Sequence, residues 1–312
     1  MTDHLRSDLQ ESLGMSDYLL NRLIQRAPHS YKVYTIPKRS GGQRTIAQPA
    51  KETKFIQRWL IQNIFSRLPV HECATAYKDG ASIKQNASAH KDHNYLTKLD
   101  FKDFFQSIKF DDLVSHISKH LGASLGAQDI QDIARISCIR LEVKSDLCLS
   151  VGAPSSPVIS NTIMYSFDSE VSVWCVKSGI TYTRYADDLT FSTNIKGISS
   201  DIEPFVRDVA QKLTYPRLSL NNKKTTHLSK KYQRRITGII INNEGDISLG
   251  RNRKREISAL IHKFTLGILP ESEIFRLQGL LGFAKDVEPL FVARMRGKYS
   301  SKLILEILQK RK

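Results

Sequence analysis

The chain has 312 residues, of which 40% are apolar, so it can bury a sizeable core and is neither a short peptide nor a disordered tail. Its net charge of +16 and pI near 9.7 favour a polyanionic partner, nucleic acid first, because so many Lys and Arg residues repel one another unless phosphates neutralise them. No apolar run reaches the roughly 18 residues of a spanning helix and the N-terminus lacks a signal-peptide pattern, which predicts a cytoplasmic protein with no membrane partner.

Two short helices and a hairpin are predicted at the start of the chain. Leucines and isoleucines at helical spacing place the helices within residues 1–30, with Ser16 as an N-cap. Alternating residues on both sides of a Ser-Gly-Gly turn predict a hairpin over residues 31–49. Lys38, Arg39 and Arg44 cluster about that turn, which on this segment alone suits a solvated basic turn as well as an anion-binding tip.

An amphipathic helix is predicted over residues 51–68, with Trp59 in the core. The segment that follows carries Asn86 and His90, one helical turn apart, where they could offer donors and acceptors to a ribose hydroxyl or a phosphate. These two residues by themselves favour a helix cap and an ordinary surface histidine.

A strand is predicted over residues 95–99, with Asp100 at its end and the segment DFKDFF closing it. Strand alternation would send Phe104 and Phe105 to opposite faces, so that one of them packs in the core.

The middle of the chain is predicted to be helical. Helices are expected over residues 110–122 and 128–139, and a turn at residues 151–161 enters a third helix whose apolar face includes Ile163, Phe167 and Val171. Gly152 in that turn would allow a close backbone approach to a base pair or nucleotide. The four cysteines are irregularly spaced with no C-x-x-C pair, which argues against a disulfide framework or zinc site and predicts reduced thiols in the core.

The stretch TYTRYADDLTFS at residues 181–192 is predicted to be a hairpin with Asp187 and Asp188 at its tip. Such a pair alone is more often a solvated turn, because Asp is a common turn residue. Together with Asp100, however, it supplies three hard oxygen donors from neighbouring strands, which could hold two Mg²⁺ ions. Two metal ions stabilise the attacking and the leaving oxygen of a phosphoryl displacement, which is the chemistry of a nucleic-acid polymerase.

Beyond this hairpin, a helix is predicted over residues 202–213 and another hairpin, with an Asn-Glu-Gly turn, over residues 234–249. Between them, LNNKKTTHLS carries Lys224, which near a triphosphate could stabilise charge or protonate the leaving pyrophosphate. Lys223 is an almost equal candidate, and a solvated charge is the alternative for either lysine.

The C-terminal segment is predicted to form helices over residues 257–264, 271–283 and 290–307. From residue 251 onward it carries 14 Lys and Arg against 6 Asp and Glu. Basic helices of this kind suit a duplex held by its phosphates, although such charge runs are often only solvated faces.

Motif by motif, the chain resembles a bacterial retron reverse transcriptase. YADD is preceded by DFKDFF, with GAPSSP between them in the order of that family, and the N-A-x-x-H, N-x-x-K-T and I-T-G segments resemble further family motifs. The resemblance, which runs from about Tyr31 to the C-terminus, implies an α+β, right-handed polymerase with fingers, a palm with an antiparallel sheet and a helical thumb. We expect the N-terminal helices and fingers at 1–95, the palm at 96–249 with a helical insertion at about 111–150, and the basic thumb at 250–312. Val151 stands where the family usually has Gln, which puts a side-chain contact there in doubt.

The resemblance also implies roles for single residues. Asp100, Asp187 and Asp188, with the carbonyl of Phe101, would hold two Mg²⁺ ions, and Lys224 would assist catalysis. Phe105 would exclude a 2′-hydroxyl. The residues implied at the nucleotide are Lys38, Arg44, Asp103, Phe105, Gly152 and Ala153. Those implied at the RNA are Asn86, His90, Thr237, Gly238, Arg253, Lys254 and Arg255.

The activity implied is that of an RNA-directed DNA polymerase that takes dNTPs and uses a cognate structured non-coding RNA as primer and template. It would start from a 2′-hydroxyl of that RNA, make a branched RNA–DNA product (msDNA), and belong to an antiphage defence system with a separate effector protein. The alternatives are another short reverse transcriptase, from a group II intron or a diversity-generating element, and an RNA-binding scaffold without catalysis.

Overall fold

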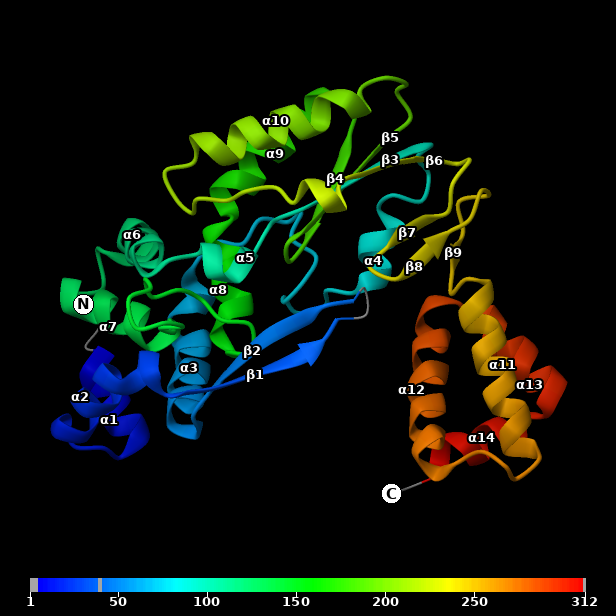
Figure 1. Cartoon of the computed structure of the whole chain (residues 1–312), viewed down its shortest axis with the longest axis horizontal. Helices are drawn as coiled ribbons and strands as arrows, with labels where there is room; N and C mark the ends of the chain where they lie inside the picture. The colour runs from blue at the N-terminus through cyan, green and yellow to red at the C-terminus, as the bar shows by residue number, and fades with distance from the viewer. Residues whose placement is uncertain (1–4, 39–40, 311–312) are drawn as a thin grey trace.

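The computed structural model of the chain, drawn in Figure 1, describes residues 5–38 and 41–310. It combines helices with antiparallel strands, which confirms the expected α+β class. The chain runs from a helical layer near the N-terminus, through a central sheet, to a group of helices at the C-terminus (Figure 1). Arg39, expected at the first hairpin turn, lies outside the described residues.

The N-terminal helices form as predicted. Ser16 is the N-cap of the second helix, since its hydroxyl accepts a hydrogen bond of 3.5 Å from the Leu19 amide. Trp59 packs against the core but is only partly buried, with its indole N–H donated to Ser12 at 3.1 Å, so the expectation of a core tryptophan holds only in part. Tryptophan at such an edge keeps its polar atom near solvent while its ring packs on the core. The elements of this layer are α1 (Leu5–Leu13), α2 (Asp17–Arg26), η1 (Ala27–His29), α3 (Lys51–Asn63) and η2 (Phe65–Arg67).

Strands β1 (Tyr31–Pro37) and β2 (Gln43–Pro49) form the first hairpin, paired in register from Tyr31 opposite Pro49 to Pro37 opposite Gln43. Most of both strands is exposed, while Ala47 and Pro49 near the base are buried. The hairpin runs from the N-terminal helices toward the side on which the C-terminal helices lie (Figure 1). Its base is tied down by the Ala47 amide, which donates to the Val151 carbonyl at 2.8 Å.

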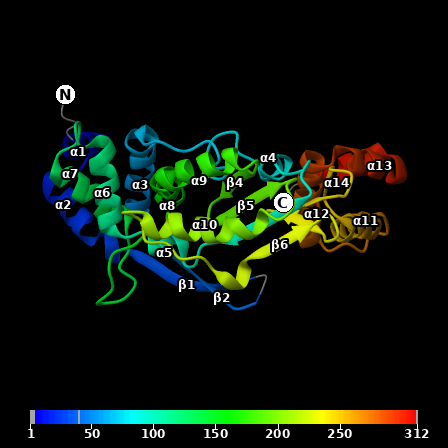
Figure 2. The ribbon, with the colours of Figure 1, turned by 90° about the horizontal axis from the view of Figure 1, so that it is seen from above.

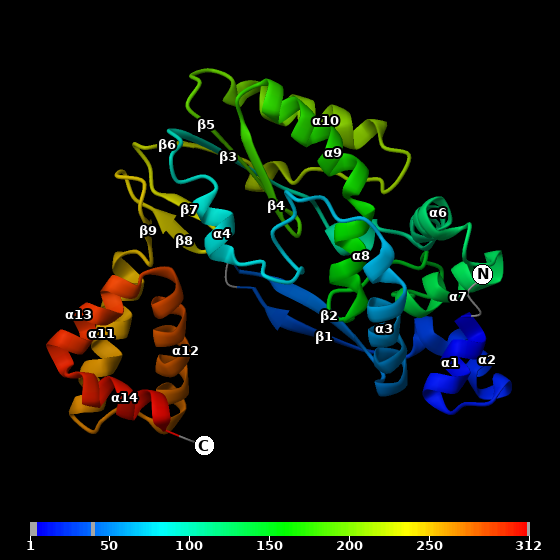
Figure 3. The same ribbon diagram turned by 180° about the vertical axis from the view of Figure 1, so that it is seen from behind.

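The central sheet has the strand order β4-β5-β3-β6 and is antiparallel throughout. Helices α9 and α10 pack on one of its faces, as Figure 2 and Figure 3 show from two further directions. The aliphatic side chains of the middle strands are buried against them, which anchors both strands that carry the carboxylates. The elements are β3 (Tyr95–Asp100), β4 (Thr181–Tyr185), β5 (Asp188–Thr193), β6 (Thr226–Ser229), α9 (Tyr165–Lys177) and α10 (Ser199–Lys212).

Two local predictions around this sheet are wrong. The segment after Asp100 is not a strand end but a turn with Asp103 in the left-handed region (φ 46°), followed by the short helix α5 (Phe104–Ser107). The single helix expected after residue 155 is two, α8 (Ser155–Ile163) and α9, because Met164 departs from helical geometry (ψ −1°). Helices α6 (Phe110–Leu121) and α7 (Ala127–Ser137) form as predicted, with Gly122 as the C-cap of α6.

The single hairpin predicted over residues 234–249 is in fact two consecutive hairpins. Strands β7 (Arg234–Ile236), β8 (Ile239–Ile241) and β9 (Ile247–Ser248) form a three-stranded sheet. Between β7 and β8, Thr237 (φ 46°) and Gly238 (φ 88°) make a two-residue turn, a geometry that requires positive φ at both positions. The short helix α4 (Ile83–Ser88) packs against this sheet.

Four helices close the chain and stand apart from the central sheet (Figure 1). They are α11 (Arg251–Thr265), α12 (Glu271–Val287), α13 (Pro289–Tyr299) and α14 (Ser301–Gln309). The last two were expected as one helix, but Ser300 takes φ 78° between them and caps α14 by accepting a bond from the Leu303 amide at 3.2 Å.

The buried apolar side chains form two main clusters. One joins the N-terminal helices to the central sheet, and the other joins α4 and the β7–β9 sheet to the four C-terminal helices. All four cysteines are buried and unpaired, as predicted. Within the described part of the chain, no helix is long and apolar enough to cross a membrane.

Candidate active site

The register of the central sheet brings the three predicted carboxylates together. Asp100 ends β3 directly opposite Asp188, the first residue of β5. The turn before Asp188 holds Ala186 at φ 58°, and the Asp187 carbonyl accepts a bond from the Phe101 amide at 3.2 Å. The carboxylates therefore lie at one edge of the sheet, carried by two adjacent strands.

The three carboxylates at this edge of the sheet repel one another, and nearby cations offset this repulsion only in part. Burial, and then the charge of Asp100, raise the pKa of Asp187. Burial and the charge of Asp187, with a further contribution from Asp100, raise the pKa of Asp188 to about 6. Carboxylates with raised pKa values gain from a nearby cation, because a cation favours their charged forms.

Lys224 is the cation beside Asp100. It ends the 3-10 turn η3 (Asn222–Lys224), and its Nζ lies 2.8 Å from both carboxylate oxygens of Asp100. Burial opposes the charge of the ammonium, but the bonds to Asp100 and the other carboxylates outweigh it and raise the pKa of Lys224. The contact singles out Lys224 from Lys223, which does not line the pocket described below.

The donor set suits a divalent ion only after a rearrangement. Carboxylate oxygens are the ligands that Mg²⁺ prefers, and the raised pKa values of Asp187 and Asp188 mark a site that favours added positive charge. Among the residues described, however, no three acidic, His or Cys side chains are grouped closely enough to hold an ion as they stand. Lys224 competes for Asp100, so the residues fit a divalent ion if its ammonium gives way.

One pocket joins Asp100 and Asp187 to four of the predicted nucleotide residues, Lys38, Arg44, Asp103 and Phe105. Its volume is about 380 Å³, and its walls come from the hairpin β1–β2, the end of β3, the β4–β5 turn and η3. The predicted residues that line it are Lys38, Arg44, Asp100, Phe101, Asp103, Phe105, Asp187 and Lys224. Basic residues of the hairpin tip therefore face the carboxylates across a space suited to a triphosphate.

Phe104 and Phe105 divide as predicted, although for a different reason. Phe104 is 3% exposed and stacks on Phe101, with ring centroids 5.9 Å apart. Phe105 is half-buried and lines both this pocket and a neighbouring one of about 340 Å³. The two rings meet edge to face with centroids 5.5 Å apart, and they differ in burial because they are successive residues of the helical turn α5, not of a strand.

Gly152 and Ala153 line the neighbouring pocket, but Gly152 makes its close approach to the protein itself. It has φ 122°, and a Cβ at this position would lie 2.9 Å from the Ala47 carbonyl oxygen of β2. The structure therefore gives an internal reason for glycine at this position, and contact of Gly152 with a base pair or nucleotide stays a prediction. Glycine lets the 151–154 turn lie against the hairpin, while Val151 lines both pockets.

Asn86 and His90 lie inside the protein, 0% and 1% exposed. His90 bonds through its two ring nitrogens to Ser192 at 2.6 Å and Thr183 at 2.7 Å, and Thr183 donates to Asn86 at 2.6 Å. Burial lowers the pKa of His90 to about 3, so the ring is neutral. The expected RNA contact by these side chains is corrected: their polar atoms join α4 to the central sheet.

The remaining residues expected at the RNA fall around the junction of β7–β9 with α11. Gly238 and Arg253 line a pocket of about 340 Å³ there, and Arg255 is exposed. Thr237 donates to the Ile83 carbonyl at 3.4 Å, so its hydroxyl holds α4. Lys254 forms an ion pair with Glu288 at 2.6 Å, which makes it a link between α11 and α13 rather than a free surface cation.

Sequence reasoning missed two features of this region. Tyr77 lines both pockets, although only its unusual backbone (φ 58°) marks it out, and no sequence pattern revealed that conformation. Arg184, two residues before Ala186 of the β4–β5 turn, is fully buried in an ion pair with Asp168. An arginine within an otherwise strand-like run was the available signal, since a buried arginine needs a partner.

Comparison with known proteins identifies the family. A family model described as reverse transcriptase (RNA-dependent DNA polymerase) matches residues 36–241. Retron Ec83 reverse transcriptase of Escherichia coli is 39% identical over 98% of both chains. Retron Ec73 reverse transcriptase of the same species is 33% identical over 88% of this chain and 89% of that one.

Among solved structures, apo telomerase from Candida tropicalis truncated from its C-terminal domain aligns with a TM-score of 0.48 at 15% identity. The alignment covers 74% of this chain and 59% of the telomerase chain. The sequence matches extend over nearly the whole chain, and residues of the DFKDFF, YADD and N-x-x-K-T segments line one pocket. The chain therefore belongs to the bacterial retron reverse transcriptases, a family of RNA-directed DNA polymerases whose chemistry depends on divalent metal ions.

Proposed function

We propose that this reverse transcriptase uses a cognate structured RNA as both primer and template, and joins deoxynucleotides to it at the pocket around Asp100, Asp187 and Asp188. The observation that carries the proposal is the convergence of Asp100 and Asp187 with Lys38, Arg44 and Lys224 on one pocket of about 380 Å³, with Asp188 paired opposite Asp100 on the adjacent strand. The division into fingers at 1–95, palm at 96–249 and thumb at 250–312 is part of the proposal.

The carboxylates supply the negative charge at which the reaction is organised. Asp100, Asp187 and Asp188, with the Phe101 carbonyl, are the proposed ligands of two Mg²⁺ ions, which would stabilise the attacking and leaving oxygens. The raised pKa values of Asp187 and Asp188 support this assignment, because both side chains gain from added positive charge.

The other pocket residues would bind and orient the nucleotide. Lys38 and Arg44 approach from the hairpin tip, where an ammonium and a guanidinium can hold phosphate oxygens. Lys224, once displaced from Asp100, carries a proton that it can donate to the leaving pyrophosphate. The half-buried ring of Phe105 would lie against C2′ of the sugar and exclude a 2′-hydroxyl.

The RNA would lie along the basic side formed by the β7–β9 sheet and α11. Gly238 and Arg253 line a pocket there, and Arg251 and Arg255 are exposed on the same helix. Arg251 and Arg255 are one helical turn apart and share a face, where their guanidinium groups suit phosphates spaced along a duplex. Replacing these arginines should weaken the binding of RNAs of all sequences alike.

The product and the biological role are inferred from the relatives. Two proteins named retron reverse transcriptases match most of the chain at 39% and 33% identity. This similarity supports initiation from a 2′-hydroxyl of the RNA and a branched RNA–DNA product, msDNA. It also supports membership of an antiphage defence system that includes a separate effector protein.

The test is to isolate the nucleic acid bound to the protein purified from cells that carry its native neighbouring DNA. We expect a short DNA joined to RNA in the wild type and none in an Asp187→Asn, Asp188→Asn variant. Asp208→Asn is the matched control, because Asp208 forms an exposed ion pair with Lys212 on α10, away from the pocket. DNA without a branch would indicate another kind of reverse transcriptase, and RNA alone in both preparations would indicate a scaffold.

A further inference from the structure

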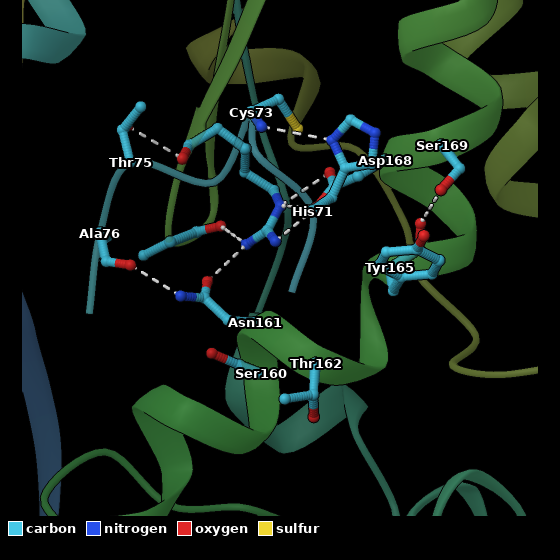
Figure 4. A network of polar contacts seen from close by, with 12 residues as sticks. His71, Cys73, Thr75, Ala76, Ser160, Asn161, Thr162, Tyr165, Asp168 and Ser169 are labelled. Carbon is cyan, nitrogen blue, oxygen red and sulfur yellow. Dashed lines mark hydrogen bonds and ion pairs between the residues drawn. The ribbon is translucent and has the colours of Figure 1, made fainter. Parts of the chain in front are cut away.

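A buried polar network contacts the turn between β4 and β5. This turn, formed by Ala186 and Asp187, carries one of the proposed metal ligands and is called the catalytic turn below. Arg184 on β4 and Asp168 on α9 are both 0% exposed and form a bidentate ion pair, with Nη2 2.6 Å and Nε 3.1 Å from the same carboxylate oxygen and Nε 2.9 Å from the other. Tyr182 donates its hydroxyl to Asp168 at 2.9 Å. Figure 4 shows Asp168 projecting from its helix into this network, with Asn161 below it on the preceding helix.

The third nitrogen of the guanidinium is turned toward the active site. Nη1 of Arg184 donates to the Ala186 carbonyl at 3.1 Å and to the Asn161 side-chain oxygen at 3.2 Å. Ala186 is the left-handed residue of the catalytic turn, immediately before Asp187. The guanidinium thus fixes the carbonyl on which the position of the turn depends.

Asn161 continues the network to a second backbone segment. Its side-chain nitrogen, Nδ2, donates to the Ala76 carbonyl at 2.6 Å, a contact drawn in Figure 4. The segment also runs beside β4, where the Arg184 amide donates to the Cys73 carbonyl at 2.9 Å and the Thr75 amide to the Arg184 carbonyl at 2.8 Å. One arginine and one asparagine therefore hold both the catalytic turn and the chain that leads to Tyr77.

Tyr77 follows the anchored carbonyl and stands at the pocket. Its side chain is exposed (43%), its ring centroid is 6.4 Å from that of Tyr185, and it lines both pockets beside the carboxylates. Its φ of 58° is costly for a residue with a large side chain and persists only where surrounding contacts impose it. The Asn161 bond to the preceding carbonyl is such a contact.

A buried ion pair is a weak source of net stability, because desolvation of the two charges offsets much of their attraction. An apolar pair of similar volume would fill the same space, but it could not hold the carbonyls of Ala76 and Ala186. The geometry of the network thus points to alignment rather than stability as its use.

We propose that Arg184 and Asn161 are positioning residues that hold the Tyr77 wall of the pocket in register with the catalytic turn, so that Tyr77 contributes to the affinity for the incoming deoxynucleotide. This inference rests on the assignment of the pocket as the nucleotide site.

The test compares steady-state dNTP incorporation on a supplied RNA template and primer. In Asn161→Asp, the carboxylate still accepts from Arg184 but can no longer donate to Ala76, so only the second arm of the network is cut. Since a lost hydrogen bond of this kind costs about a factor of ten, we expect KM for the dNTP to rise about tenfold with kcat within about twofold of wild type. Ser160→Ala, which removes a hydroxyl bonded within the same helix to the Pro157 carbonyl, is the matched control and should leave both values unchanged.

Removal of the ring tests the same path from its other end. Tyr77→Ala should raise KM for the dNTP by a similar factor. The KM of the double variant with Asn161→Asp should not exceed that of the single variant with the higher KM, because both substitutions act through one element. Multiplicative effects, or an unchanged KM in either single variant, would overturn the proposal. If Asn161→Asp does not fold, an unchanged KM in Tyr77→Ala still overturns it, because that side chain is exposed. A wild type that incorporates no dNTP would instead refute the proposed function.

Discussion

Replacing Asp188 by Asn should stabilise the protein while abolishing DNA synthesis. Burial and the charge of Asp187, with a further contribution from Asp100, raise the pKa of Asp188 from 3.8 to about 6. The folded state therefore binds the proton more tightly than the unfolded state. The stability that this group contributes is complete below pH 3.8 and is lost as the pH rises through about 6. Asn resembles the protonated acid at every pH and avoids the loss.

The magnitude follows from the two pKa values. At about 1.4 kcal/mol per pKa unit, the shift from 3.8 to about 6 corresponds to about 3 kcal/mol at pH 7.5 and about half of that at pH 5. Asp187 also has a raised pKa, and the same substitution removes a negative charge close to it. The gain in stability is therefore shared between the two carboxylates. A measured gain of about 1–3 kcal/mol in the free energy of unfolding is expected at neutral pH.

Urea unfolding of the wild type and Asp188→Asn, each at neutral pH and near pH 5 in EDTA, measures this gain. Excess Mg²⁺ should then narrow the difference, because an ion that binds the folded wild type stabilises it. Asp208→Asn removes an exposed carboxylate and should show no such gain. The reasoning is refuted if Asp188→Asn is less stable than wild type at neutral pH, or if its advantage does not shrink as the pH falls.

Three further substitutions test the site. Lys224→Ala should lower the single-turnover rate constant for nucleotide incorporation about 10- to 100-fold, while Lys223→Ala stays within about twofold; equal losses would contradict the assignment of Lys224. Phe105→Ala should raise ribonucleotide incorporation relative to deoxynucleotide by about tenfold or more, and an unchanged ratio would remove Phe105 as the gate. His90→Ala should destabilise the fold by about 2–4 kcal/mol in urea, because it removes two buried hydrogen bonds and leaves a cavity where the ring was, without changing the RNA affinity of the folded protein. A stable His90→Ala variant that binds RNA weakly would restore a direct contact.

Local patterns in the sequence were sufficient for much of the fold. Strand alternation around Asp100 and the YADD turn, helical spacing in α6 and α7, and a serine cap at Ser16 each depend on residues near one another in the chain. The three carboxylates were predictable for the same reason, since their residue type and their place at strand ends are visible without tertiary contacts. Breaks were predicted less well: Met164 and Ser300 end helices through backbone angles that no residue pattern announced.

Tertiary contacts determined which of the predicted residues face the pocket. The register that sets Asp100 opposite Asp188, and the approach of Lys224 to Asp100 across 124 positions of sequence, depend on pairing between distant segments. The same pairing buries His90 beneath the sheet, although its position in the sequence suggested an exposed ligand. A polar side chain has the same local pattern whether it meets water, RNA or a buried partner. The sequence alone therefore determined which chemistry the chain carries, and long-range packing determined which groups can reach a substrate and which hold the site together.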